Sequence, residues 1–303
     1  MAAELRIAVV VPFLDEQEHL PDLLASMASQ TRAPDVLLLV DDGSGDRSPQ
    51  LAHAYAASHP NTRVLRRPPR AVGRDRLAGG AAVRAFDWGV GQIDGEWDVV
   101  AKVDADLRLN PHLLAALEDA FLADPRLGMA GSYLAVLDDA GRPVRQRCRP
   151  EHVEGETKFY RRGCYDAIAP LPAMLGWDTI DEVRARLSGW RTASLDVPGG
   201  DSLHVRPMGS HDGRLRGFRR WGRCAWAYGE HPLHVLAVAV QRLGDRPRLL
   251  GGLSYLLGYG HAALRRLPRA EKAVRREVRG DGLRRLWRRV TLRSSVPDPL
   301  EVL

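Results

Sequence analysis

The sequence has few cysteines and no long apolar run. Its three cysteines, Cys148, Cys164 and Cys224, are widely spaced and form no Cys-x-x-Cys pair, so neither a disulfide framework nor a zinc site is indicated and we expect structural cysteines. No run of about 18 or more apolar residues predicts a transmembrane helix. The first residues lack the basic region and the small-residue cleavage site of a signal peptide. We therefore expect a cytoplasmic protein.

The glycine-rich loops that often hold nucleotides are also missing. No Gly-x-Gly-x-x-Gly follows the first aliphatic run, where Pro12 and Phe13 stand instead, and the chain has no Walker A sequence. A Rossmann dinucleotide site and a P-loop are therefore excluded. A nucleotide bound here must be held by carboxylates and a cation instead of a glycine cradle.

The first hundred residues alternate regularly between two patterns. Continuous β-branched and aliphatic runs, typical of strands buried on both faces, alternate with stretches whose apolar residues recur at helical spacing. The predicted strands are 5–13, 36–44, 62–67 and 97–106, and the predicted helices are 15–30, 48–60 and 77–92. This rhythm predicts an α/β fold whose parallel sheet has helices on both faces and binds ligands at the carboxyl ends of its strands.

Two acidic motifs stand at the ends of predicted strands. Asp41 and Asp42 begin an Asp-Asp-Gly-Ser sequence, and Asp104 and Asp106 follow a later strand, one residue apart. Such a pair can hold a hard divalent cation against a diphosphate, whereas the first motif also suits a turn that caps the next helix. Lys102 interrupts the apolar run before Asp104, and we expect an edge position with its amine in solvent, phosphate contact being the alternative.

Four segments, in this order, resemble those of family 2 glycosyltransferases. They are VVVPFLDEQEHL at 9–20, VDDGS at 40–44, VDAD at 103–106 and LGWDTIDEVRARLSGWRT at 175–192. The resemblance covers residues 5–215. It implies the GT-A fold, with a Rossmann-like, mostly parallel sheet, and an inverting transfer of a sugar from a nucleotide-sugar donor. We place this catalytic domain at 1–215.

The resemblance also implies a donor site. Pro12, Phe13 and Glu16 are expected to line the base and ribose pocket. Asp41 or Asp42 would accept hydrogen bonds from the base or ribose, because both offer donors. The expected donor is a UDP- or GDP-sugar.

The metal site is implied in the same way. Asp104 would meet the ribose, or the metal through water, and Asp106 would ligate Mg²⁺ or Mn²⁺, hard ions that take oxygen ligands. A loop beyond residue 200 resembles a phosphate-binding segment of polyprenyl-phosphate sugar synthases, and its matching residues are His204, Arg206, Gly209, Ser210 and His211. We expect Arg206 to bind donor phosphate and His211 to complete the metal shell.

Further basic residues lie between the acidic motifs. Arg70, Arg74 and Arg76 belong to a segment comparable to one whose basic groups reach the diphosphate or base in the family, and Asp87 stands where Asn is common. We take Arg74 as the representative candidate. Ordinary surface charge is the alternative for all three arginines.

Inversion at the anomeric carbon needs a base that deprotonates the acceptor hydroxyl. Family 2 enzymes place this base in a Glu-Asp pair. A comparison anchored on residues 184–186 puts Asp178 at the second position of the pair, with Trp177 in place of the usual Glu. The base therefore stays open between Asp178, which we prefer, and Asp181, with Glu182 third. One of these acids is expected to cap the helix that they share.

The C-terminal part, 216–303, is predicted to be an α-helical, basic extension. It has two short apolar stretches, 233–240 and 249–259, followed by twelve Arg and Lys against three acids between residues 265 and 293. An apolar face beside basic residues is typical of interfacial helices, so we expect contact with an anionic membrane surface. A helical pair packed on the catalytic domain is the alternative. Nucleic acid is not an expected partner, because stacking aromatics are lacking.

Together these features predict a metal-dependent, inverting glycosyltransferase. It would move a sugar to a hydroxyl acceptor, free or lipid-linked, in polysaccharide or glycolipid synthesis of the cell envelope, at the inner face of the cell membrane. The alternatives are a nucleotidyltransferase of similar fold and an inactive nucleotide-sugar binding protein, the latter because Trp177 replaces the usual Glu.

Overall fold

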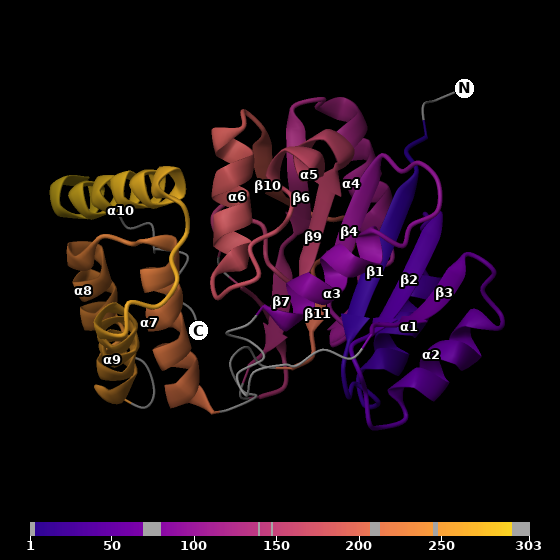
Figure 1. The fold of residues 1–303 in the computed structure, drawn as a ribbon, viewed down its shortest axis with the longest axis horizontal. Coiled ribbons are helices and arrows are strands. Elements are labelled where there is room, and N and C mark those ends of the chain that lie inside the picture. Colours follow the sequence, from indigo (N-terminus) through magenta and orange to yellow (C-terminus); the bar gives the residue numbers. More distant parts are fainter. Residues whose placement is uncertain are drawn as a thin grey trace.

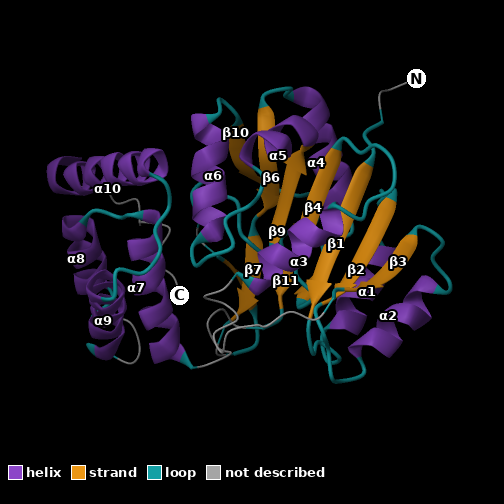
Figure 2. Cartoon of the chain, in the orientation of Figure 1, coloured by secondary structure: helices purple, strands orange, loops and turns teal. Residues whose placement is uncertain are grey.

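The computed structural model describes residues 4–68, 80–138, 140–146, 148–206, 213–244 and 248–292. Within them the chain forms an α/β unit around a seven-stranded sheet and, beside it, a group of C-terminal helices (Figure 1, Figure 2). The helix α6 (Trp177–Leu187) lies between the sheet and this helical group, which it contacts.

The main sheet has the strand order β10-β6-β9-β4-β1-β2-β3. Its strands are β1 (Ile7–Phe13), β2 (Val36–Asp41), β3 (Thr62–Arg66), β4 (Val99–Val103), β6 (Leu127–Ser132), β9 (Thr157–Arg161) and β10 (Arg191–Leu195). All neighbours pair in parallel except β9, which runs antiparallel to both β4 and β6. The carboxyl ends of β1, β2 and β4 therefore meet at one edge, and both acidic motifs follow these ends.

Both faces of the sheet are buried, as the continuous apolar runs predict. Alternate residues of a strand point to opposite faces, and in β1 Val9 and Val11 join one apolar cluster whereas Ala8 and Val10 join the other. The helices of the α/β unit are α1 (Leu20–Ala28), α2 (Ser48–Ala56), α3 (Ala81–Val90), α4 (Leu113–Ala123), α5 (Arg162–Ile168) and α6. The predicted α/β architecture is confirmed.

A second, smaller sheet supports the segment after β4. Its strand order is β5-β11-β7-β8, and its strands are β5 (Leu107–Arg108), β7 (Leu134–Leu137), β8 (Pro143–Arg145) and β11 (Ser202–His204). His204 of β11 pairs with Leu107 of β5. This pairing holds His204 beside the acidic pair, although the two lie about a hundred residues apart in the sequence.

The C-terminal helices are α7 (Arg214–Tyr228), α8 (Pro232–Gln241), α9 (Leu250–Leu264) and α10 (Lys272–Leu292). Two glycines bring α7 and α9 together, because a Cβ at Gly222 would overlap the carbonyl of Tyr255 and one at Gly258 would overlap that of Arg219. The helix α10 packs on α6, through Val274 and its neighbours. The predicted helical C-terminal part is confirmed.

Two further expectations, on transmembrane helices and on Lys102, can be compared with the structure. None of the helices in the described ranges combines the length and the apolarity needed to cross a membrane. Lys102 was expected to extend its amine into solvent, and this interpretation is wrong. It lies on β4 between β1 and β9, only 1% of its surface is exposed, and its ammonium is paired inside the protein.

Candidate functional site

A cavity of about 770 Å³ opens at the carboxyl ends of β1, β2 and β4, and we call it the strand-end cavity. Residues from widely separated segments line it: Pro12, Phe13, Leu14, Glu16, Asp42, Gly80, Ala81, Ala82, Ala85, Asp104, Ala105, Asp106, Trp177, Arg206, Arg216, Arg219, Arg220, Arg223 and His261. Most of the predicted donor-site residues therefore share one cavity. Arg74 and His211 lie outside the described residues, as do Arg70, Arg76, Gly209 and Ser210.

The acidic pair lies on the wall of this cavity. Asp106 Oδ2 lies 3.3 Å from His204 Nε2 and 3.7 Å from Arg206 Nε. The guanidinium of Arg206 also pairs with Glu16, which follows β1. Asp104 pairs instead with the buried Lys102, whose Nζ donates a second hydrogen bond of 2.8 Å to the carbonyl of Gly155. Each carboxylate of the pair thus has its own basic partners.

Because of these partners, the pKa values of the two acids are shifted in opposite directions. Burial raises the pKa of Asp104, and the nearby Lys102 does not fully offset it. Burial acts the same way on Asp106, but the hydrogen bond from His204 and the charge of Arg206 outweigh it and lower its pKa. Asp106 is therefore the more strongly ionised of the two acids.

Two neighbours of the pair titrate near neutrality or above. Burial, with smaller contributions from Asp106 and Asp104, raises the pKa of Glu16 to about 7 against the opposing charge of Arg206. Burial lowers the pKa of His204, but its hydrogen bond to Asp106 and the surrounding acids raise it to about 9. A protonated His204 therefore balances the charge of Asp106.

The donor set suits a hard divalent cation. Among the described residues, no three His, Cys, Asp or Glu side chains converge on one point, so the protein alone offers no closed metal cage. Asp104 and Asp106 offer carboxylate oxygens on an open cavity wall. Mg²⁺ and similar ions are commonly held by one or two carboxylates together with substrate phosphates. The residues present therefore fit a cation that arrives with a diphosphate.

Asp41 and Asp42 have different surroundings. Asp41 is buried, and its Oδ1 accepts hydrogen bonds from the backbone N–H groups of Gly43 and Ser44 at 3.1 and 2.7 Å, which fixes the turn after β2. Asp42 lines the strand-end cavity and pairs with Arg67 at 2.9 Å. The turn alternative thus describes Asp41, whereas Asp42 is the one of the two acids that lines the strand-end cavity.

The three candidate bases on α6 point to different places. Asp181 is fully buried and accepts hydrogen bonds of 2.7 Å from both Lys158 Nζ and Tyr160 Oη. Glu182 is also buried, and it pairs with His152 at 2.7 Å and with Arg186. Neither acid lines the strand-end cavity.

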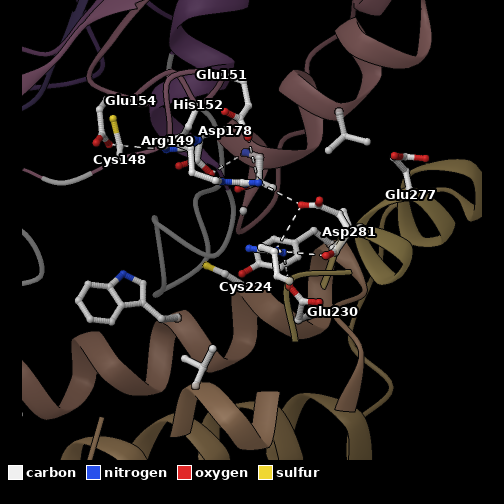
Figure 3. Close-up of a pocket in the computed structure, with 18 of the residues that line it drawn as sticks. Cys148, Arg149, Glu151, His152, Glu154, Asp178, Cys224, Glu230, Glu277 and Asp281 are labelled. Carbon is white, nitrogen blue, oxygen red and sulfur yellow. Dashed lines mark hydrogen bonds and ion pairs between the residues drawn. The ribbon is translucent and has the colours of Figure 1, made fainter. Parts of the chain in front are cut away.

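Asp178 and Trp177 lie on two different cavities. Trp177 lines the strand-end cavity, and its ring is 5.3 Å from Lys102 Nζ and 5.4 Å from Lys158 Nζ, both distances measured to the ring centroid. Asp178 lines a second cavity of about 440 Å³, which lies between the α/β unit and the C-terminal helices (Figure 3). Position 177, where the family resemblance led us to expect Glu, therefore adds an aromatic ring to the cavity that Asp104 and Asp106 also line.

The second cavity is rich in charged groups from four parts of the chain. Figure 3 shows Cys148, Arg149, Glu151, His152 and Glu154 from the segment before β9, Asp178 from α6, Cys224 and Glu230 near α7, and Glu277 and Asp281 from α10. Arg149 Nη1 lies 3.0 Å from Asp281 Oδ2, and this ion pair joins α10 to the α/β unit.

The structure adds residues that the sequence alone did not single out. Burial and the charge of Glu154 raise the pKa of Glu156 to about 7, and Glu156 lines the second cavity. Four arginines of α7, namely Arg216, Arg219, Arg220 and Arg223, line the strand-end cavity. Their spacing, which repeats by three and four residues, is a helical signal in the sequence. Asp87, by contrast, accepts hydrogen bonds from Tyr165 Oη and the Leu171 N–H and lines neither cavity.

Comparison with known proteins identifies a family that matches this chain. The model of the family described as "Glycosyl transferase family 2" matches residues 8–171. The undecaprenyl-phosphate mannosyltransferase of Micrococcus luteus is 34% identical over 116 residues, which are 38% of this chain and 44% of that protein. The polyprenol monophosphomannose synthase of Mycolicibacterium smegmatis is 33% identical over 132 residues, 43% of this chain and 46% of that protein. The chain thus spans less than half the length of these curated relatives.

Among solved structures, a mannosyltransferase from Pyrobaculum calidifontis in complex with GDP-Man and Mn²⁺ has a similar fold. The TM-score is 0.53 at 17% sequence identity, and the match covers 94% of this chain and 84% of that one. At this identity the likeness concerns the fold alone.

Proposed function

Because the chain belongs to glycosyl transferase family 2 and has the GT-A fold, we propose that it transfers a sugar from a nucleoside-diphosphate donor to a lipid-linked phosphate. The observation that carries this proposal is the composition of the strand-end cavity. There the acidic pair Asp104 and Asp106 shares a cavity of about 770 Å³ with five arginines, and this volume has room for a nucleotide-sugar and a second phosphate.

The donor half of the cavity suits a nucleoside diphosphate. Pro12 and Phe13 offer an apolar wall for the base, and Asp42 offers an acceptor for its donors or those of the ribose. Mg²⁺ or Mn²⁺, held by Asp104 and Asp106, would neutralise charge that builds up on the departing diphosphate. Arg206 is held between Glu16 and Asp106, where its guanidinium reaches the same phosphates.

The acceptor half of the cavity suits an anion. The arginines of α7 add a positive surface to the cavity that the acidic pair also lines, and arginine recognises phosphate oxygens by paired hydrogen bonds. A phosphate oxygen is already ionised, so its attack on the anomeric carbon needs no general base. This agrees with Trp177 at the cavity and Asp178 outside it. The names of two relatives, which refer to undecaprenyl phosphate and polyprenol monophosphomannose, support the same acceptor class.

The test is transfer of label to lipid. The full chain, Mn²⁺ and undecaprenyl phosphate are incubated with radiolabelled GDP-mannose or a UDP-sugar, and label in the organic phase is measured together with released nucleoside diphosphate. We expect equal amounts of both products, and loss of both in Arg219→Gln/Arg220→Gln but not in Arg63→Gln, an exposed arginine of β3. Release of pyrophosphate would instead indicate a nucleotidyltransferase, and binding without any product a nucleotide-sugar binding protein.

A second candidate is transfer to an acceptor hydroxyl with Asp178 as the base. It is favoured by the second cavity, which Asp178 lines and which has room for a sugar ring. For a hydroxyl acceptor, Asp178→Asn should lower turnover at least about a hundredfold while donor binding stays nearly unchanged. For a phosphate acceptor, turnover should change less than about fivefold, because no proton has to be removed. The kcat of this one variant therefore separates the two candidates.

A further inference from the structure

Helices α8 and α9 contain no Asp, Glu, Lys or Arg. Their sequences, PLHVLAVAVQ and LGGLSYLLGYGHAAL, carry histidine as the only ionisable groups besides tyrosine. A helix on the surface of a globular protein normally turns a charged or polar face to water. The outward faces of these two helices are therefore unusual for a chain in which 27% of the residues are charged.

The outward faces consist of large aliphatic side chains. Leu233, Leu236 and Val240 on α8, and Leu250, Leu253 and Leu257 on α9, are each between 47% and 58% exposed. Both sets are spaced by three and then four residues, so each forms one stripe along its helix. Leu243, Leu249 and Leu264 extend these stripes, and we call the nine side chains the leucine face.

The two stripes belong to helices that pack directly against each other. A Cβ at Gly252 would overlap the carbonyl of Ala239, so α8 and α9 approach closely at this point. Their opposite sides are buried in a cluster that includes Val235 and Val238 of α8 and Tyr255 of α9, with Ala225 of α7. The leucine face is thus the side of the helix pair that is turned away from this cluster. It is an outer surface and does not belong to the apolar core of the helical group.

Basic residues border the leucine face. Arg248 precedes α9, and Arg265 and Arg266 follow it, all three exposed. Over residues 231–270 the sequence has six arginines and a single acid, Asp245. Apolar side chains that insert and arginines that stay at the headgroups are the combination found on interfacial helices, and the positive rim selects anionic lipid.

The leucine face also leads to the strand-end cavity. His261 of α9 lines that cavity, and it lies one helical turn from Leu257 and one from Leu264. The exposed stripe of α9 therefore runs past the mouth of the cavity that holds Asp104 and Asp106. A lipid lying along this stripe would have its headgroup at the arginines of α7.

We propose that the leucine face docks on an anionic lipid bilayer, with its aliphatic side chains inserted and Arg248, Arg265 and Arg266 at the headgroups. Docking depends only on the leucine face and the arginines beside it, and not on the reaction in the strand-end cavity. The delivery of a lipid-linked phosphate to the strand-end cavity is the part that rests on the proposed function. Membrane contact was expected for the whole C-terminal extension, and we now propose it for α8 and α9 only. The apolar residues Val274 and Val278 of α10 pack on α6 instead.

The experiment is co-sedimentation of the full chain with vesicles of phosphatidylcholine, alone or mixed with phosphatidylglycerol. Leu253→Glu/Leu257→Glu places charge in the leucine face, and Leu122→Glu/Leu187→Glu makes the same change at exposed leucines of α4 and α6. We expect the first variant to lose at least tenfold in partitioning and the second to match the unchanged chain. Arg265→Gln/Arg266→Gln should weaken binding to the mixed vesicles only, and high salt should do the same.

Two further measurements keep the result unambiguous. Calorimetry with GDP or UDP and Mn²⁺, without lipid, reports the strand-end cavity separately, so unchanged nucleotide binding in Leu253→Glu/Leu257→Glu shows that the variant is folded and leaves the proposed function intact. Light scattering after gel filtration reports self-association. Equal vesicle binding by this variant and the unchanged chain would overturn docking by the leucine face. Docking would also be overturned if the unchanged chain bound no vesicles but formed a dimer, and if Leu253→Glu/Leu257→Glu dissociated that dimer.

Discussion

At the scale of single residues, the site depends on how each acid is partnered. Only one residue separates Asp104 from Asp106 in the sequence. Yet Asp104 pairs with Lys102, whereas Asp106 contacts His204 and Arg206. Asp178 and Asp181 are three residues apart, yet one lines a cavity and the other is locked between Lys158 and Tyr160. Sequence spacing places such residues near each other, but the contacts of each side chain decide what it can do.

Asp106→Asn should remove the metal dependence of nucleotide binding. The substitution keeps the size of the side chain but removes the charge that a divalent cation needs, so the affinity for GDP or UDP in Mn²⁺ should fall at least about tenfold. Calorimetric titration with Mn²⁺ and with chelator measures it. Asp119→Asn, at an exposed position of α4, is the matched control and should bind as the unchanged chain does. An unchanged affinity of Asp106→Asn would exclude Asp106 from the metal site.

The pair of the partly exposed His152 and the buried Glu182 should make stability depend on pH. Burial lowers the pKa of His152, but the charge of Glu182 and the hydrogen bonds to Glu154 and Glu182 outweigh it and raise the pKa to about 10. A raised pKa of a histidine means that the folded state holds the proton more tightly. The stabilisation is therefore complete below pH 6.5, the ordinary pKa, and is lost as the pH rises through about 10.

Urea unfolding of His152→Gln against the unchanged chain tests this dependence. At pH 6 the variant should be less stable by about 2 kcal/mol, the scale of a charge-assisted hydrogen bond, and the difference should shrink by pH 10. His53→Gln, at an exposed position of α2, should show no such trend. A difference that stays constant from pH 6 to pH 10 would contradict the raised pKa.

At the scale of helices and strands, glycine decides how the C-terminal helices meet. The Gly222 and Gly258 positions let the backbones of α7 and α9 approach, because larger side chains would overlap carbonyl groups of the facing helix. Since α7 carries the arginines of the strand-end cavity and α9 carries the leucine face, this contact couples the two surfaces. Gly260 of the same helix has no such role, because nothing lies near it.

Gly258→Ala should therefore destabilise the fold, whereas Gly260→Ala should not. The added methyl group at position 258 meets the backbone of Arg219, and overpacking of this kind costs about 1–3 kcal/mol. At position 260 the same methyl meets open space, and alanine in place of glycine inside a helix gains about 0.5–1 kcal/mol. Chemical unfolding of both variants measures the contrast. Equal effects of the two substitutions would argue against close α7–α9 packing.

At the scale of the whole molecule, helices beyond the family segment contribute to the strand-end cavity. The match to the family model ends at residue 171, but α6, α7 and α9 supply Trp177, four arginines and His261 to the strand-end cavity. The division into a catalytic domain at 1–215 and an extension at 216–303 stays a prediction. The contacts of α10 with α6 and of Arg149 with Asp281 join the two parts.

Nucleotide and cation together should stabilise the whole chain. A ligand that binds only the folded state adds about 2.7 kcal/mol at a hundred times its Kd, which raises the Tm by several degrees. In a thermal-shift screen of GDP, UDP and their sugars, we expect the shift with Mn²⁺ to exceed that without it, and the nucleoside that shifts most identifies the base. No shift with any nucleotide would count against the strand-end cavity as the donor site.

The α/β alternation and the position of Asp42, Asp104 and Asp106 at one edge of the sheet could be predicted from the sequence. Both follow from local patterns, because apolar periodicity fixes strands and helices and the carboxyl ends of parallel strands share an edge. The candidate donor residues Pro12, Phe13, Glu16 and Arg206 share this cavity as well. Their roles in binding stay predictions.

Which of these side chains face a cavity and which are buried depends on the three-dimensional packing of the chain. Lys102 is internal because β4 is a central strand, and Asp181 is enclosed because β9 brings Lys158 and Tyr160 against α6. Trp177 and Asp178 lie on different cavities because α6 packs between the sheet and the C-terminal helices. These outcomes depend on contacts between segments far apart in the chain, and local periodicity carries no information about such contacts.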